Sequence, residues 1–142
     1  MCLAGQTRDY IFGYTILNDV SARDVQTAHK QWYFGKSLDG FTPIGPCIVT
    51  ADAFADYPPR LGIRSFVNGE KRQDSNTALQ IFDIDHVIAE LSQGMTLKAG
   101  TIIATGTPAG VGMGMDPPQF LKPGDVVRCE IDGIGTLTNP VR

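Results

Sequence analysis

The sequence predicts a mainly β α+β fold, in which a rolled or sandwiched sheet carries a few short helices. Short apolar runs separated by turn residues recur along the chain, and only residues 22–31 and 83–93 suit helices. Asn68-Gly69 and Asp132-Gly133 each stand between two extended runs, which is a strong short-range signal for a β-hairpin. With 142 residues, the chain is long enough to form one domain, 1–142, with its own core.

The first predicted element is a core strand over residues 10–17, which are rich in aromatic and β-branched residues and carry no charge. Charges begin at Asp19, so this carboxylate is expected at a strand-to-helix corner. Ser21, with Asp24 three positions later, has the form of a capping box and predicts a helix over 22–31. A carboxylate at such a corner suits a hard cation such as Mg²⁺, Mn²⁺ or Ca²⁺. The alternative is an aspartate that only stabilises the turn.

Three aromatic residues, 32–34, lead into Gly35 and Lys36. This apolar approach predicts that the Lys36 ammonium lies in a confined pocket, where it polarises a carbonyl or a carboxylate. The alternative is an ordinary solvated lysine. Turn residues occupy 39–46, and residues 47–49 predict a short buried strand.

Residues 61–67 and 70–73 flank Asn68-Gly69 and predict the first hairpin. Residues 83–93 then predict an amphipathic helix that covers a sheet, because their apolar side chains recur with helical spacing and Gly94 follows. His86 lies off the apolar face, so it is expected to be a surface residue without a chemical role.

The second stretch of interest is a short predicted strand, 101–104, which leads into the glycine-rich segment 105–114. Glycines permit left-handed backbone and close approach, so successive N–H groups are able to form an anion-binding nest beside the hydroxyls of Thr105 and Thr107. The alternative is a bend that merely needs glycine. The spacing matches neither a Walker loop nor a dinucleotide-binding loop.

The chain closes on a second predicted hairpin, with strands over 126–131 and 134–138 on either side of Asp132-Gly133. No internal repeat and no low-complexity tract interrupts the chain. The elements therefore follow one another as a single β-rich unit.

Composition favours a small-molecule partner over nucleic acid or an anionic membrane, since the net charge is −3 and no Lys/Arg cluster occurs. The cysteines at 2, 47 and 129 are widely spaced and form no zinc pattern with His29 or His86, which fits a reducing cytoplasm. No apolar run approaches the length of a membrane span. A soluble, cytoplasmic protein is expected.

Four segments, in this order and spacing, resemble the fumarylacetoacetate hydrolase family: 18–26, 35–37, 67–70 and 104–112. The resemblance extends from about Tyr10 to the last residue. It implies a mixed β-sandwich roll, a divalent metal, Mg²⁺ first, and hydrolysis, decarboxylation or isomerisation of 2-oxo, enolisable carboxylic acids. Acylpyruvates, fumarylpyruvate-type diketo acids, oxaloacetate and 2-hydroxyhepta-2,4-diene-1,7-dioate are substrates of this kind.

The resemblance also implies roles for six residues, matched position by position. They are the metal ligand Asp19, the catalytic Lys36, which faces the substrate's oxygens, and four substrate-binding residues, Arg23, Gln26, Gly106 and Thr107. In such a site the metal acts as a Lewis acid on a chelated 2-oxo acid, and the lysine adds positive charge where the enolate forms.

The chain departs from the family pattern at its start. In the family a Glu-x-Glu pair well upstream of the Asp19 position completes the metal site, whereas residues 1–9 contain no Glu. The chain is therefore expected to be the C-terminal part of a family member, with an incomplete set of metal ligands and with sheet edges that pair with another chain in a homodimer. The alternative hypothesis is a non-catalytic fragment that folds and self-associates.

Overall fold

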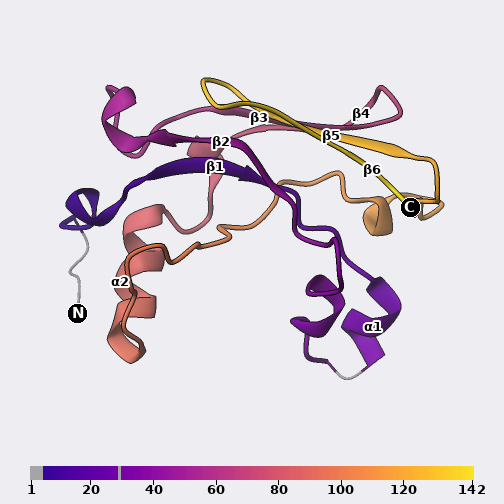
Figure 1. The fold of residues 1–142 in the computed structure, drawn as a ribbon, viewed down its shortest axis with the longest axis horizontal. Coiled ribbons are helices and arrows are strands. Elements are labelled where there is room, and N and C mark those ends of the chain that lie inside the picture. Colours follow the sequence, from indigo (N-terminus) through magenta and orange to yellow (C-terminus); the bar gives the residue numbers. More distant parts are fainter. Residues whose placement is uncertain (1–4, 29) are drawn as a thin grey trace.

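The computed structural model describes residues 5–28 and 30–142, so Cys2 and His29 lie outside the described residues (Figure 1). Its two α-helices are α1 (Arg23–Ala28) and α2 (Ile84–Gly94). The strands are β1 (Gly13–Leu17), β2 (Ile44–Thr50), β3 (Gly62–Val67), β4 (Glu70–Asn76), β5 (Val126–Ile131) and β6 (Gly135–Pro140). The predicted mainly β α+β fold with short helices is confirmed.

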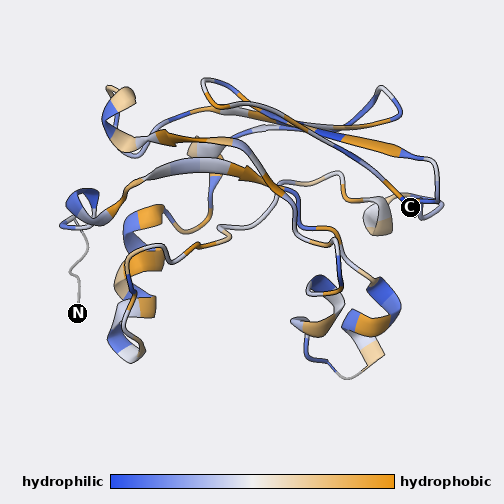
Figure 2. Cartoon of the chain, in the orientation of Figure 1, coloured by the Kyte–Doolittle hydropathy of each residue, from blue (hydrophilic) through white to orange (hydrophobic). Residues whose placement is uncertain are grey.

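The strands form two antiparallel sheets, one of β1 and β2 and the other in the order β4-β3-β5-β6. Figure 1 shows the two sheets as neighbouring layers, with both helices beyond the β1–β2 layer, on the side away from the four-stranded sheet. Figure 2 shows apolar stretches on β2, β5 and α2.

The core lies between β1 and the β5–β6 hairpin. Ile16 of β1 is 2% exposed and clusters with the buried Ile134 and Leu137. Tyr14 and Phe54 close one side of this cluster with an edge-to-face contact whose ring centroids are 5.6 Å apart. The β1 strand thus leads from the core directly to Asp19.

Both predicted hairpins are confirmed. Asn68 and Gly69 have φ values of 52° and 85°, as the mirror-image turn between β3 and β4 requires. The Asn68 side chain also ties this turn to β5, because it accepts a hydrogen bond of 2.9 Å from the Val126 amide. In the second hairpin the turn residue Ile134 is buried in the core.

The helix over residues 83–93 is confirmed as α2. Asp83 caps it by accepting a 2.7 Å hydrogen bond from the His86 amide, and Ile88 is buried. His86 is exposed, as predicted, and stacks on Phe82. In the described part of the chain, no helix has the length and apolarity to cross a membrane.

Three expectations about strands need correction. β1 begins at Gly13, because Arg8–Tyr10 forms a short 3-10 helix. β2 is longer than predicted and is not buried, since Ile48 is 57% exposed while its neighbour Val49 faces the core. Residues 101–104 form no strand, because none of the six strands takes them as a ladder partner.

The predicted capping box is also wrong. The Ala22 carbonyl accepts the first helical hydrogen bond, 2.9 Å from the Gln26 amide, so α1 begins after Ala22 and ends at Ala28. The Ser21 hydroxyl instead donates a 3.1 Å hydrogen bond to the Asp19 carbonyl. Ser21 therefore belongs to the corner itself, beside the predicted site.

Candidate active site

The structure brings Asp19, Ser21 and Lys36 together at the corner between β1 and α1. The Lys36 Nζ atom lies 2.5 Å from Asp19 Oδ2 and 3.0 Å from Ser21 Oγ. The lysine side chain is 25% exposed and the aspartate side chain 37%. Lys36 is thus an ordered cation with a carboxylate partner, and it keeps one open side.

Gly35 determines where Lys36 lies. It is buried against α1, and its carbonyl accepts a 2.8 Å hydrogen bond from the Ala22 amide. A Cβ atom at this position would lie 2.8 Å from the Gln26 nitrogen, so only glycine lets the backbone approach so closely. Thr42 holds the other side by donating a 2.7 Å hydrogen bond to the Lys36 carbonyl.

The predicted apolar approach to Lys36 is wrong. Trp32, Tyr33 and Phe34 are 64%, 81% and 62% exposed, so they line no closed pocket around the ammonium in the described structure. Backbone contacts of Gly35 and the ion pair with Asp19 do the positioning that the aromatic residues were expected to do.

Arg23 and Gln26 face each other on α1. Gln26 is only 5% exposed, and its Oε1 atom accepts a 2.8 Å hydrogen bond from Arg23 Nη1. The helix therefore presents the two residues as a joined pair. Their roles in substrate binding stay predictions.

The glycine-rich loop combines close packing with one open position. A Cβ atom at Gly110 would lie 2.0 Å from the Arg72 carbonyl oxygen, and one at Gly112 would lie 1.9 Å from the Gln119 carbonyl oxygen. These two glycines serve backbone packing, which is the alternative that the sequence left open. Gly106 has a φ of 103° and no atom within 4 Å of its Cβ position, so open space lies beside it.

Thr107 is exposed on this loop and is held by a residue that the sequence did not single out. Gln73 of β4 donates a 2.8 Å hydrogen bond from Nε2 to the Thr107 hydroxyl oxygen. The hairpin signal at Asn68-Gly69 predicts β4, but nothing in the sequence indicates which loop crosses that strand. No hydrogen bond or ion pair between described residues joins Thr107 to the Lys36 corner.

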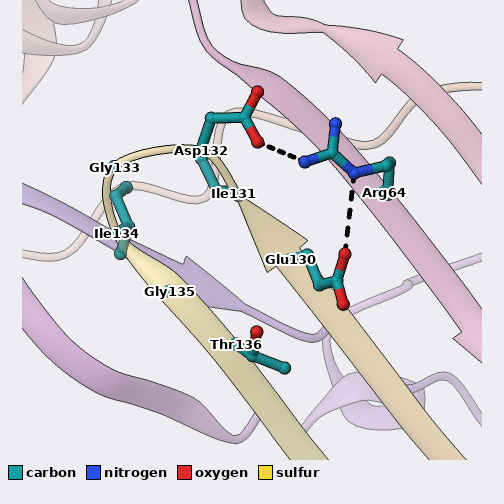
Figure 3. A pocket seen from close by; sticks show the side chains of 8 residues that line it. All are labelled: Arg64, Glu130, Ile131, Asp132, Gly133, Ile134, Gly135 and Thr136. Carbon is teal, nitrogen blue, oxygen red and sulfur yellow. Dashed lines mark hydrogen bonds and ion pairs between the residues drawn. The ribbon is translucent and has the colours of Figure 1, made fainter.

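A hollow of about 550 Å³ lies elsewhere, at the β5–β6 turn (Figure 3). Arg64 pairs there with Glu130, at 3.6 Å, and with Asp132. One arginine thus faces two carboxylates, and none of the predicted site residues lines the hollow. It is therefore distinct from the predicted site.

The described residues do not form a complete metal site. Within 5–28 and 30–142, no three His, Cys, Asp or Glu side chains gather as a ligand group. Asp19 has the oxygen chemistry that Mg²⁺ prefers, but its Oδ2 atom is occupied by Lys36. One paired carboxylate does not fit a tightly bound divalent cation.

The family model described as "Fumarylacetoacetate (FAA) hydrolase C-terminal" matches residues 3–142. The chain belongs to the fumarylacetoacetate hydrolase family. A solved fumarylacetoacetate hydrolase from the psychrophile Exiguobacterium antarcticum is 52% identical and superimposes with a TM-score of 0.93, over 98% of this chain and 50% of that one. The resemblance and the predicted family fold are confirmed.

Two further relatives of this family carry activity names. Oxaloacetate tautomerase YisK of Bacillus subtilis is 52% identical over 133 residues, which are 94% of this chain and 44% of that protein. A 2-hydroxyhepta-2,4-diene-1,7-dioate isomerase from Mycobacterium marinum is 47% identical with a TM-score of 0.85, over 97% of this chain and 50% of that one. The chain thus spans about half the length of the relatives it matches.

Proposed function

We propose that this chain contributes the substrate-facing part of an enzyme that interconverts the keto and enol forms of 2-oxo carboxylic acids, with oxaloacetate as the first substrate to test. The observation that carries the proposal is the anchored ammonium of Lys36, 2.5 Å from Asp19 and 3.0 Å from Ser21. The names of the two relatives, a tautomerase and an isomerase, support this reaction class.

Enolisation transfers a proton from the carbon next to the keto group to a base, here water, and the electron pair of that C–H bond forms the enolate, whose negative charge lies on oxygen. The enolate oxygen then takes up a proton from water to give the enol. An ammonium group has three N–H donors. Asp19 and Ser21 occupy two of them, which leaves one for the oxygen where charge develops. Because the lysine is already oriented, little reorganisation is needed when that charge appears.

The carboxylate of the substrate is proposed to bind at the glycine-rich loop. The exposed hydroxyl of Thr107 and the open space beside Gly106 supply a donor and room for an anion. Arg23 and Gln26 are proposed as further substrate contacts on α1.

Two further components, a metal ion and a second copy of the chain, would come from outside the described residues. A divalent cation, Mg²⁺ before Mn²⁺ or Ca²⁺, would take the second carboxylate oxygen of Asp19 as one ligand. A homodimer is likewise proposed, because large apolar side chains such as Tyr10, Phe12 and Ile48 are 77%, 73% and 57% exposed. We propose the cytoplasm as its location.

The second candidate is a non-catalytic chain that folds and self-associates. The incomplete group of metal ligands favours it. Catalysis and self-association make different predictions for Lys36, since only catalysis depends on the ammonium.

The deciding experiment measures oxaloacetate tautomerisation, through the absorbance of the enol, in the chain itself and in a chimaera. In the chimaera this chain replaces the matching part of Bacillus subtilis YisK. We expect turnover in the chimaera, and its loss on Lys36→Met. The matched control is Lys98→Met, at an exposed lysine outside the predicted site. A folded chimaera without activity would support the non-catalytic candidate instead.

A further inference from the structure

One side chain of β4 holds the loop that carries Thr107. Gln73 Nε2 donates two hydrogen bonds of 2.8 Å, one to the Thr107 hydroxyl oxygen and one to the Pro108 carbonyl. A buried or half-buried amide donor that lacks a protein partner needs a water molecule instead. Gln73 is half-buried, so this fork satisfies both of its N–H groups.

The orientation of the Gln73 amide follows from its partners. The Pro108 carbonyl can only accept a hydrogen bond, so the amide nitrogen must face the loop. On the other side, Gln73 Oε1 accepts a 2.8 Å hydrogen bond from the Ser65 hydroxyl. Ser65 and Gln73 are direct cross-strand partners of β3 and β4, so the sheet itself supports this orientation.

A β-bulge brings this part of β4 to the loop. The register passes from Ser65 opposite Gln73 to Phe66 opposite Lys71, which leaves Arg72 as the extra residue. A bulge bends the strand and changes the direction of its side chains and carbonyl groups. The Arg72 carbonyl oxygen lies against Gly110, where a Cβ atom would be only 2.0 Å away. The loop therefore rests on two neighbouring residues of the bulged strand.

This arrangement decides what the Thr107 hydroxyl can do. A hydroxyl has one proton, and its oxygen already accepts from Gln73. The proton is therefore left to point away from Gln73, on the exposed side of the loop. A donor presented in this way suits a carboxylate, which only accepts hydrogen bonds.

We propose that Gln73 is a positioning residue, which with Ser65 sets Thr107 as a hydrogen-bond donor to a carboxylate of the substrate. This inference rests on the proposed function, since that function assigns the carboxylate to Thr107. It adds a specificity device in β3 and β4, which the family resemblance did not indicate. Gln73 acts through Thr107 and need not touch the substrate.

The test uses Gln73→Glu in the 142-residue chain. A carboxylate at this position cannot donate a hydrogen bond to the loop. It instead accepts a hydrogen bond from the Thr107 hydroxyl, whose proton is then not available to the substrate. Calorimetric titration with malonate, a dicarboxylate that needs no turnover, should show a Kd weakened by about tenfold or more. In the chimaera with oxaloacetate as substrate, the same substitution should raise KM by a similar factor while kcat changes little.

Matched variants separate positioning from general damage. Ser65→Ala should weaken malonate binding in the same direction but by less, and Thr107→Ser, which keeps the hydroxyl, should bind as the unaltered chain does. Combining Gln73→Glu with Thr107→Val should weaken malonate binding little more than Thr107→Val alone, because both variants remove the Thr107 hydroxyl as a donor to the carboxylate. Gln93→Glu makes the same charge change on α2, where Gln93 bonds only to Glu90 in the described structure, and should leave Kd unchanged.

Each outcome decides one question. If Gln73→Glu binds malonate as well as the unaltered chain does, the positioning role is wrong and the proposed function stands. If Gln73→Glu lowers the melting temperature and kcat but not the affinity, Gln73 is only structural and the inference again fails. If the unaltered chain binds no malonate, the carboxylate site fails, and the proposed function loses its substrate contact as well.

Discussion

The ammonium of Lys36 and the carboxylate of Asp19 are joined by a 2.5 Å contact, although the two residues come from different turns on either side of α1. Ser21 holds the same ammonium at 3.0 Å. Because Gly35 packs its backbone against α1, the backbone of Lys36 is held next to this corner. The corner therefore presents an ammonium group oriented by its carboxylate partner.

Replacing Lys36 with methionine keeps the length of the side chain and removes the charge. If the ammonium acts on charge that appears only during enolisation, kcat should fall by about 100-fold, roughly 3 kcal/mol of transition-state stabilisation, while KM changes little. Steady-state kinetics on oxaloacetate in the chimaera measures both constants. An unchanged kcat, with Lys98→Met as the control, would remove Lys36 from the reaction.

Magnesium should bind this chain weakly. A single carboxylate that already pairs with Lys36 offers little against the cost of dehydrating Mg²⁺, so we expect a dissociation constant of about 1 mM or weaker. Calorimetric titration measures it. Asp19→Ala should abolish the binding, whereas Asp24→Ala, on the exposed start of α1, should not. Micromolar binding that survives Asp19→Ala would place the metal elsewhere.

Gly110 and Gly106 should respond differently to alanine, although both have left-handed backbone, with φ values of 107° and 103°. Gly106→Ala meets no neighbouring atom, so it should cost only the backbone strain, about 1–2 kcal/mol. Gly110→Ala also drives its Cβ atom into the Arg72 carbonyl and should cost at least about 3 kcal/mol.

Urea unfolding of the two variants measures these free energies. The difference between them isolates the close approach of the loop to β4, since the backbone strain is nearly the same in both. Equal free energies of unfolding would mean that the loop moves away from Arg72 at little cost. The packing of the loop against β4 would then contribute little to stability.

Features with local causes were predictable from the sequence, and features that need a distant partner were not. Asn68-Gly69 carries its own turn preference, and α2 carries both its apolar face and its cap, so these elements are where they were predicted. Residues 101–104 have the composition of a strand, but no strand of either sheet pairs with them. Whether a strand finds a pairing partner depends on the tertiary structure, which the composition of the segment does not reveal.

The same distinction applies to the site. The Lys36–Asp19 contact follows from a short stretch of chain, and the family resemblance pointed to both residues. The aromatic residues before Lys36 suggested a pocket, but their exposure shows that apolar composition does not establish burial. Gln73 was missed because its importance depends on its contact with Thr107, which lies on a loop 34 residues later in the chain.

Tyr57 joins α2 to the start of the chain through a polar cluster. Its hydroxyl donates a 2.6 Å hydrogen bond to Asp85, and the hydroxyl oxygen of the fully buried Thr7 lies 2.5 Å away. Burial, together with the bond to Asp85, raises the pKa of Tyr57 to about 12. Tyr57→Phe removes a donor from a carboxylate, so it should lower the free energy of unfolding at pH 7 by about 1–2 kcal/mol.

The raised pKa of Tyr57 predicts how its contribution to stability changes with pH. The folded-state pKa of Tyr57 lies above its ordinary value of 10.0, so folding favours the protonated phenol. Its contribution is complete below pH 10 and is lost as the pH rises toward 12, so the stability gap between the unaltered chain and Tyr57→Phe should close over that range. Denaturant unfolding at several pH values measures the gap.

The control is Tyr14→Phe, whose buried hydroxyl has no partner among the described residues, so its removal should cost nothing at pH 7. A gap that stays constant from pH 9 to pH 12 would show that Tyr57 ionises as readily in the folded chain as in the unfolded one, and that Asp85 does not restrain its proton.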